Sequence, residues 1–273
     1  MKITMKTISS RDNAFYKDVK ALATSSQARR KAGRSLLDGV HLCQTWLDLR
    51  GAPVHCVVSE GALGNAEVTA IVARCDALGA PVTALPDALF NAVSQVEHGV
   101  HLLFVIATPQ PSTAPALVEA AVLLDGVQDP GNVGSILRSA AASGVKQVYC
   151  SPGTAFCWSP KVLRAAMGAH FVLDIFEHVE LAPLVRAAKV PVLATSGYAA
   201  RQLYTLDLRQ PVAWVLGHEG QGVSHELLDL ARERVVVPHA GQVESLNVAA
   251  CAAVCFFEAL RQRQAWTAAR PSR

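Results

Sequence analysis

Three segments of this chain share one local build, and that repetition constrains the fold more than any other feature of the sequence. In each, an apolar strand leads into a turn containing glycine, and the turn leads into the start of a helix. These first, second and third corners lie at residues 123–140, 214–224 and 235–250. A helix N-terminus carries unpaired backbone N–H groups and a partial positive charge, so each corner suits a ligand. Together the corners predict one shared ligand site on an α/β fold.

The sequence around the corners alternates between strand-like and helix-like segments. Apolar runs predict strands at residues 121–125, 146–150, 171–175, 190–195, 211–216 and 234–237. Helical spacing predicts helices at residues 132–143, 160–168, 180–189, 224–232 and 245–262. Such alternation is typical of a parallel sheet covered on both faces, so residues 118–273 are predicted to form one α/β domain.

A smaller α/β domain is predicted at residues 1–106. Its strands are expected at residues 35–37, 53–58, 81–84 and 100–106, and its helices at 12–22, 40–49 and 66–78. Residues 107–117 are predicted to be a linker, because the stretch ATPQPSTAPA holds three prolines and almost nothing to bury.

Basic side chains concentrate near the N-terminus. Residues 1–34 contain nine Lys or Arg and two Asp, although the whole chain has a formal net charge of only +3. A basic end on a nearly neutral body is typical of a polyanion-binding surface, and a solvated amphipathic helix explains the same charges. On the first interpretation, the candidate contacts are Arg29, Arg30, Lys31 and Arg34.

Several other classes of protein are disfavoured. The longest fully apolar run, residues 248–257, falls short of the roughly 20 residues of a membrane-spanning helix. The N-terminus has no apolar signal-like stretch, and the seven cysteines include no Cys-x-x-Cys pair. These features predict a cytoplasmic protein with core thiols. His98 and His101 have a ligand-like spacing, but two histidines alone do not predict a metal site.

Each corner contains polar residues that suit a ligand. In the first, Asn132 is a good helix N-cap, and Arg138 lies off the apolar stripe, towards the strand ends. In the second, Glu219 is the only acid among the glycines. Neither residue requires a ligand: Arg138 can be a surface residue of an amphipathic helix, and Glu219 can cap the helix that follows its turn. In the third, Ser245 and Asn247 open an alanine-rich helix, apolar almost all round, which favours a central position or a subunit interface.

Taken together, the corners resemble the motifs of the SpoU (TrmH) family of RNA ribose methyltransferases, within the SPOUT superfamily. The matching stretches are DPGNVGSILRSA, LGHEGQGVS and VPHAGQVESLNVA, and their order and spacing agree over about residues 118–262. The N-terminal domain is similar to the family's substrate-binding domain, a ribosomal-protein-like α/β sandwich. That similarity rests on ISSRDNAFYKDVKAL, the basic run and SLLDGVHL.

The resemblance implies a C-terminal domain with a trefoil knot, a rare exception to unknotted chains. It implies S-adenosylmethionine as cofactor, a homodimer formed through the last helix, and an RNA substrate, with ribosomal RNA favoured over transfer RNA. By position, the implied cofactor contacts are Gly217, Val237, Leu246, Thr195, Leu216 and Gly222.

The resemblance also implies roles in methyl transfer to a ribose 2′-hydroxyl. Arg138 stands in the catalytic position, and Asn132, Glu219, Ser245 and Asn247 are expected to orient Arg138 and the ribose. Because a guanidinium stays protonated, Arg138 is expected to hold the adjacent phosphate and polarise the hydroxyl, with proton loss assisted by phosphate or water.

Two residues depart from the family pattern. His239 stands where the family usually has an aliphatic residue or methionine, and Ala249 where it often has serine. Three other functions stay open from the sequence. They are an RNA-binding knotted module without catalysis, base methylation of tRNA or rRNA on the same scaffold, and a dinucleotide-dependent oxidoreductase. The last is disfavoured because no G-x-G-x-x-G follows the first strand.

Overall fold

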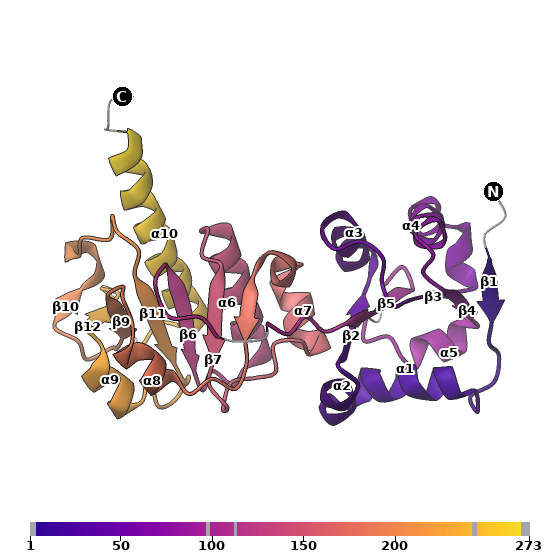
Figure 1. Ribbon diagram of the computed structural model, residues 1–273, viewed down its shortest axis with the longest axis horizontal. Helices are drawn as coiled ribbons and strands as arrows, with labels where there is room; N and C mark the ends of the chain where they lie inside the picture. Colours follow the sequence, from indigo (N-terminus) through magenta and orange to yellow (C-terminus); the bar gives the residue numbers. More distant parts are fainter. Residues whose placement is uncertain (1–3, 97–98, 112–113, 242–244, 269–273) are drawn as a thin grey trace. The chain divides into compact units, whose positions relative to one another are not determined.

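The computed structural model describes residues 4–96, 99–111, 114–241 and 245–268, and within these ranges it describes side chains up to residue 264. The chain divides into two compact units (Figure 1). The first unit comprises Met1–Pro109 and Trp158–Phe171, and the second comprises Gln110–Cys157 and Val172–Arg273. The helical segment expected at residues 160–168 therefore clusters with the first unit, although it lies far along the chain.

A five-stranded mixed sheet forms the centre of the first unit, in the order β1–β4–β3–β5–β2. β1, β4 and β3 run parallel, whereas β5 is antiparallel to both β3 and β2. The strands are β1 (Met5–Thr7), β2 (Arg34–Asp38), β3 (His55–Ser59), β4 (Val82–Leu85) and β5 (Leu102–Ala107). The helices are α1 (Ala14–Thr24), α2 (Ser26–Ala32), α3 (Val40–Leu49), α4 (Ala66–Ala77), α5 (Asp87–Asn91) and α7 (Pro160–Ala166). In Figure 1, α3 and α4 lie on one side of this sheet, and α1 and α5 on the other.

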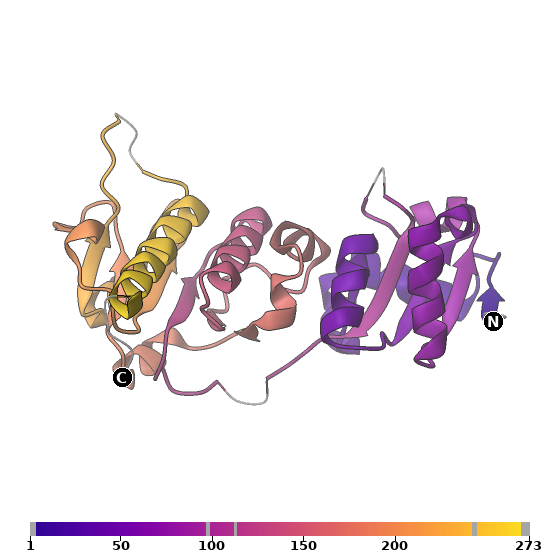
Figure 2. The ribbon, with the colours of Figure 1, turned by 90° about the horizontal axis from the view of Figure 1, so that it is seen from above.

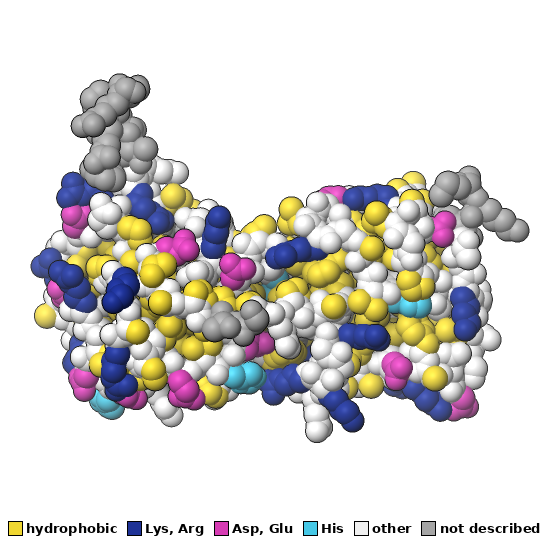
Figure 3. Space-filling view, in the orientation of Figure 1, with side chains coloured by type: hydrophobic (Ala, Val, Ile, Leu, Met, Phe, Trp, Pro, Cys, Tyr) yellow, Lys and Arg dark blue, Asp and Glu magenta, His cyan; other side chains and the backbone are white. Residues whose placement is uncertain are grey.

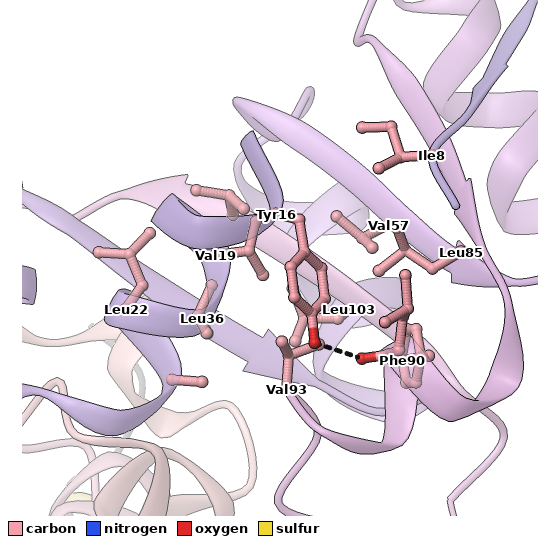
Figure 4. Packing of buried hydrophobic residues seen from close by; sticks show 13 residues of the cluster. Ile8, Tyr16, Val19, Leu22, Leu36, Val57, Leu85, Phe90, Val93 and Leu103 are labelled. Carbon is pink, nitrogen blue, oxygen red and sulfur yellow. Dashed lines mark hydrogen bonds between the residues drawn. The ribbon is translucent and has the colours of Figure 1, made fainter. Parts of the chain in front are cut away.

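The core between α1, α5 and the sheet explains why α1 forms. Tyr16, Val19 and Leu22 recur at helical spacing and are buried in one cluster with Val57 of β3 (Figure 4). The Tyr16 hydroxyl donates to the Leu89 carbonyl at 3.4 Å, so its polar end has a partner inside the core.

The segment that contains α7 packs within the first unit through both polar and apolar contacts. α7 lies against β2, and the Arg164 guanidinium donates to the Gln95 carbonyl at 3.1 Å. The Phe171 ring meets the Trp46 ring edge-on, with 5.3 Å between centroids. The Phe171 carbonyl accepts from Arg50 Nε at 3.1 Å. These contacts tie the segment to β2 and α3.

The second unit contains a seven-stranded sheet, and every strand pair in it is parallel, as the sequence predicts. The order is β10–β12–β9–β11–β6–β7–β8. Its strands are β6 (Ala121–Asp125), β7 (Gln147–Cys150), β8 (Asp174–Phe176), β9 (Val192–Thr195), β10 (Arg201–Gln202), β11 (Ala213–Gly217) and β12 (Glu233–Val236). Its helices are α6 (Pro130–Ala142), α8 (Leu181–Arg186), α9 (His225–Leu230) and α10 (Val248–Ala268).

Helices cover both faces of this sheet. Leu123 of β6 and Val215 of β11 are buried in one apolar cluster with Leu181 of α8 and Leu227 of α9. α6 and α10 pack against each other, and α10 also contacts β11 (Figure 2). Burial on both faces explains why the strands appear in the sequence as nearly continuous apolar runs.

Some elements begin elsewhere than the sequence predicts. α6 begins at Pro130 because the Asp129 carboxylate caps it, accepting the Asn132 N–H at 2.8 Å, and proline suits the first helical position. Asn132, the expected cap, is thus inside the helix. α10 begins at Val248, after Ser245 and Asn247. β8 begins only at residue 174, because residues 169–172 form a short 3-10 helix.

The connection from β9 to β11 takes a course that the sequence does not reveal. After β9 the chain passes to the far side of β12, forms the short strand β10 there, and returns to β11. β12 therefore lies between β9 and β10, although it follows both in the sequence. The two exposed residues of β10, Arg201 and Gln202, have no apolar pattern that would predict a strand.

Candidate functional site

Four neighbouring strands of the second unit end at one edge of the sheet. β6 ends at Asp125, β11 at Gly217, β9 at Thr195 and β12 at Val236. β7 and β8 extend the sheet on one side of β6, and β11, β9 and β12 extend it on the other. Ligands of parallel α/β sheets bind outside the carboxyl ends of the strands, where the strand order reverses. The candidate site therefore lies beyond the ends of β6 and β11.

Glu219 joins the second corner to the first. Its Oε1 accepts the Asp129 N–H at 3.0 Å and the Asn132 side-chain amide at 3.0 Å, and its Oε2 accepts the Gln128 N–H at 3.1 Å. Partial burial raises the pKa of Glu219, but these hydrogen bonds outweigh it and lower the pKa to about 2. Glu219 is therefore ionised throughout the neutral range and serves as an anchor for the first corner.

Two asparagines continue this link to the third corner. The Asn247 side-chain amide donates to Asn132 Oδ1 at 3.0 Å. Asn247 Oδ1 accepts the N–H groups of Ala249 and Ala250, at 2.9 and 3.2 Å, and so caps α10. Each amide orientation follows from its partners, because only the oxygen can accept and only the nitrogen can donate. The chain Glu219–Asn132–Asn247, which we call the polar link, thus connects all three corners.

Asp125 also connects the first two corners, but here the first corner supplies the carboxylate and the second supplies the N–H group. Its Oδ2 accepts the Ser224 N–H at 2.8 Å, directly after the glycine turn. The first corner thus holds the second through Asp125, and the second holds the first through Glu219. The sequence interpretation missed both Asp125 and the cap Asp129. The available signal was their position in LLDGVQDPGN, where the two acids flank a turn between an apolar strand and a helix.

The glycine turn of the second corner folds back on itself. The His218 N–H donates to the Gly222 carbonyl at 3.0 Å, and the Gly222 N–H returns to the His218 carbonyl at 2.8 Å. His218 Nδ1 accepts the N–H groups of Gly220 and Gln221, at 2.9 and 3.2 Å. A Cβ on Gly217 would overlap the backbone of Gly222 and Val223. Glycine at 217 therefore makes room for the turn itself.

The implied cofactor contacts lie around these strand ends. Leu216, Gly217 and Val237 are buried, and Gly222 has a left-handed φ of 73°. Thr195 is half-buried and its hydroxyl donates to the Val215 carbonyl at 3.2 Å, while Leu246 is 40% exposed beside the polar link. Apolar side chains next to backbone groups at strand ends fit a nucleoside ligand.

His239, the departure from the family pattern, lies at the third corner. Its Nδ1 lies 3.1 Å from the Val237 carbonyl, so the ring donates to this acceptor. The expected turn at residues 238–244 can be followed only to residue 241, because residues 242–244 lie outside the described residues.

Arg138 and Ser245 stand apart from the polar link. Arg138 is exposed on α6 and forms no ion pair or hydrogen bond with its side chain among the described residues. Ser245 is exposed too, and no described residue bonds to its hydroxyl. The structure thus brings together Asn132, Glu219 and Asn247 of the predicted catalytic residues and leaves the Arg138 guanidinium accessible to a ligand.

The candidate RNA contacts divide in the structure of the first unit. Arg30, Lys31 and Arg34 are exposed on α2 and at the start of β2. Arg29 differs from expectation, since it is only 6% exposed and its guanidinium donates to the Leu22 carbonyl near the end of α1. Burial, with a smaller contribution from the charge of Arg30, lowers the pKa of Arg29. Arg29 is a structural residue that caps the C-terminal end of α1, and it is not available to bind a polyanion.

Charges of both signs are mixed over the visible surface. Figure 3 shows Lys and Arg side chains interspersed with Asp and Glu on the face drawn. Among the described residues, no group of His, Cys, Asp and Glu could hold a metal ion, and no helix is long and apolar enough to span a membrane. His98 lies outside the described residues.

Comparisons with known proteins agree with this geometry. The model of the SpoU rRNA Methylase family matches residues 119–257. The Bacillus subtilis protein RlmP, a 23S rRNA (guanosine(2553)-2′-O)-methyltransferase, is 31% identical over 93% of this chain and 98% of its own length. An uncharacterised tRNA/rRNA methyltransferase from Synechocystis is 38% identical over 58% of this chain, and the match spans only 58% of that relative's length.

A solved structure is similar over nearly the whole chain. The crystal structure of an AdoMet-bound rRNA methyltransferase from Sinorhizobium meliloti superposes with a TM-score of 0.82 and 27% sequence identity. The superposition covers 94% of this chain and 98% of that one. Both units, and not only the corners, therefore have counterparts in one known protein.

Proposed function

The chain belongs to the SpoU rRNA methylase family, and from this premise we propose that it transfers a methyl group from S-adenosylmethionine to a ribose 2′-hydroxyl of RNA. The polar link carries the proposal, because it joins the three corners at the edge where parallel α/β sheets generally bind their ligands. The exposed guanidinium of Arg138 on α6 provides a cation at the same corner for an anionic substrate.

The ends of β11, β9 and β12 would hold the cofactor. Leu216, Gly217, Thr195 and Val237 lie at or just beyond these ends, and Leu246 adds apolar surface from the third corner. When bound, S-adenosylmethionine supplies an electrophilic methyl group on a sulfonium. The AdoMet-bound Sinorhizobium structure supports this choice of cofactor.

The residues of the chain position the substrate. Arg138 holds the RNA phosphate next to the target ribose and polarises the 2′-hydroxyl, because a guanidinium cannot accept the proton. Both carboxylate oxygens of Glu219 already accept hydrogen bonds from the first corner, so we assign Glu219 to positioning. Proton loss is assigned to the RNA phosphate or water as the methyl group is transferred, and Asn132, Asn247 and Ser245 orient the ribose.

Ribosomal RNA is the substrate that we favour. The Bacillus relative, named as acting on 23S rRNA, aligns with 93% of this chain, so the alignment extends well into residues 1–106. Within residues 1–106, followed by the linker at 107–117, Arg30, Lys31 and Arg34 would contact phosphates and make binding depend on salt. An enzyme of ribosomal RNA acts where ribosomes are assembled, so we expect it in the cytoplasm.

We further propose the family's knot and homodimer for the second unit. The position of β12 between β9 and β10 supports a knot, because β12 follows both strands in the sequence yet inserts between them. The exposed Phe257 on α10, 46% accessible, supports a dimer through this helix. Sedimentation velocity, followed by comparison with a Phe257→Glu variant, tests the dimer.

A methyl-transfer assay tests the function. The protein is incubated with tritiated S-adenosylmethionine and RNA from a strain that lacks its gene, and the labelled nucleoside is identified by mass spectrometry. We expect a 2′-O-methylated nucleoside. A methylated base, or no transfer despite cofactor binding, would overturn the proposal.

Arg138→Ala tests the residue assignment in the same assay. Methyl transfer should fall by about a hundredfold or more, because substrate alignment is lost, while the dissociation constant of S-adenosylmethionine, measured by calorimetry, stays within a few fold. Loss of cofactor binding in this variant would show that Arg138 has a different role.

A further inference from the structure

The loop after β9 exposes two tyrosines. Tyr198 is 92% exposed, more than any other large apolar or aromatic side chain described, and Tyr204 is 57% exposed. The backbone beneath Tyr198 is nevertheless held in place. The Tyr198 N–H donates to Ser196 Oγ at 3.3 Å, and the Ser196 N–H donates to the Val235 carbonyl at 2.9 Å. A fixed backbone thus presents an unpacked aromatic ring to solvent.

This loop lies at the edge of the sheet that carries the proposed site. It begins directly after Thr195, a candidate cofactor contact at the end of β9. β10 pairs with β12 at Val235 and Val236, close to the third corner. Leu203 is fully buried and anchors the short 3-10 helix that carries Tyr204. Both tyrosines therefore border the region where the substrate of the proposed reaction must approach.

Arg201 gives the same loop a positive charge that no carboxylate neutralises. Among the described residues it forms no ion pair, and its guanidinium reaches only the Thr205 carbonyl, at 3.5 Å. Two other arginines of this unit are neutralised: Arg186 pairs with Glu226 at 2.7 Å, and Arg234 pairs with Asp229 at 2.6 Å. Residues 196–206 contain no acid. The loop therefore favours an anionic partner with flat faces.

We propose that Tyr198, Arg201 and Tyr204 form a platform for an unpaired nucleotide of the RNA, beside the nucleotide that is methylated. This inference rests on the proposed function and narrows its substrate to RNA whose target region is single-stranded. Bases stack on aromatic rings whatever their sequence, and arginine binds the phosphate between them. A base inside a duplex is already stacked and paired, so it cannot lie on the Tyr198 ring.

RNA binding by the full-length protein tests the platform directly. The probe is a single-stranded oligoribonucleotide with one 2-aminopurine, whose fluorescence responds to stacking, and the comparison is the same strand in a duplex. Tyr198→Ala should weaken single-strand binding by about tenfold or more, since one stacked base contributes roughly 1–3 kcal/mol. Tyr198→Phe should bind like the wild type, because it keeps the ring. Arg201→Ala should make the affinity for the single strand less dependent on salt concentration, by the amount expected for the loss of about one phosphate contact.

Val118→Ala is the matched control. Val118 is 58% exposed in the same unit, but it precedes β6 and so lies at the opposite edge of the sheet. This variant should bind the probe as the wild type does. Methyl transfer to RNA from the gene-deletion strain should show a raised apparent KM in Tyr198→Ala, with kcat within about twofold.

Four results would overturn the platform. They are equal probe binding by Tyr198→Ala and wild type, preference of the wild type for the duplex, loss of S-adenosylmethionine binding in Tyr198→Ala, and a change in its sedimentation. The third would assign the ring to the cofactor, and the fourth to a contact with a second copy. The proposed function fails separately, if the wild type binds the probe but methylates no RNA.

Discussion

At the scale of single residues, Glu219 shows that surroundings set the role of a carboxylate. Its three hydrogen bonds hold it ionised, with a pKa of about 2 despite the opposing effect of burial, so it serves as an anchor for the first corner and not as a proton acceptor. The sequence singles out Glu219, because it is the only acid in the turn, but its partners come from a segment some ninety positions earlier.

Glu219→Gln should make stability less dependent on pH. The folded-state pKa, about 2, lies below the ordinary value of about 4.3, so ionised Glu219 stabilises the fold above the ordinary value. That stabilisation is lost as pH falls from about 4.3 through about 2. We expect the variant to lose about 1 kcal/mol of unfolding free energy at neutral pH, and the difference to vanish in acid. Urea denaturation over a pH series measures it. A difference that stays constant with pH would contradict the anchor role.

Asn247→Asp should separate helix capping from the polar link. An aspartate caps α10 as well as asparagine does, but it cannot donate to Asn132 Oδ1. Asn132 cannot flip in compensation, because its oxygen would then face the Glu219 carboxylate. We expect a loss of stability smaller than that from removing the cap, because the new carboxylate faces Asn132 Oδ1 in place of a hydrogen bond. Methyl transfer should fall by about a hundredfold.

Asn247→Ala is the companion variant and should lose about 1 kcal/mol of stability as well as activity. Thermal unfolding and single-turnover methyl transfer distinguish the two variants. A fully active Asn247→Asp protein would show that the link has no part in the reaction.

The sequence predicts residue identities at the site better than residue roles. Asn132, Glu219 and Asn247 stand out from motif position, but the cap of α6 is Asp129, and Asn247 caps a helix that was expected to open at Ser245. Arg29 shows the same limit, because the basic run does not reveal which side chain turns inward. Such roles depend on contacts between distant segments, which spacing along the chain does not encode.

At the scale of elements, the second corner depends on the absence of one side chain. Gly217→Ala should destabilise the protein by about 3 kcal/mol or more, because a Cβ there would overlap the backbone of Gly222 and Val223. Gly220→Ala is the control, since its Cβ would meet only the His218 ring at ordinary contact distance, 3.6 Å. Differential scanning calorimetry of the two variants measures the difference. Equal melting temperatures would mean that the turn moves aside without cost.

The central strands are predictable because burial on both faces makes them continuously apolar. Their ends are less so, as β8 shows by starting after a 3-10 turn at residues 169–172. β10 is only two residues long and both are exposed, so its sequence does not predict a strand. It forms a strand because it pairs with β12. Pairing of this kind is a tertiary effect.

At the scale of the whole molecule, the first unit draws on two separate parts of the chain. The residues Trp158, Leu163 and Phe171 are buried, and the sequence gives no sign that they pack in the first unit. Alternation of strands and helices places residues 160–168 in the second domain, because it records local periodicity and not the surface that a helix buries.

A fragment that starts at residue 110 should therefore be prone to aggregation. Without residues 1–109, the apolar side chains of the segment 158–171 lose the surface that covers them. We expect strong binding of the dye ANS and a soluble yield well below that of the full chain. Replacing Trp158, Leu163 and Phe171 by polar residues in the fragment should restore solubility. A soluble, ANS-silent parent fragment would show that this segment refolds against its own unit.

The place of β12 in the sheet also bears on how the protein is made. A ribosome delivers β9 and β10 first, and both must wait until residues 233–236 leave the exit tunnel before the strand between them exists. The sheet therefore cannot close during synthesis until β12, the last of its seven strands along the chain, has emerged. Translation that stops short of residue 233 would release a polypeptide with a gap in its sheet and two exposed edges, a substrate for chaperones and proteases.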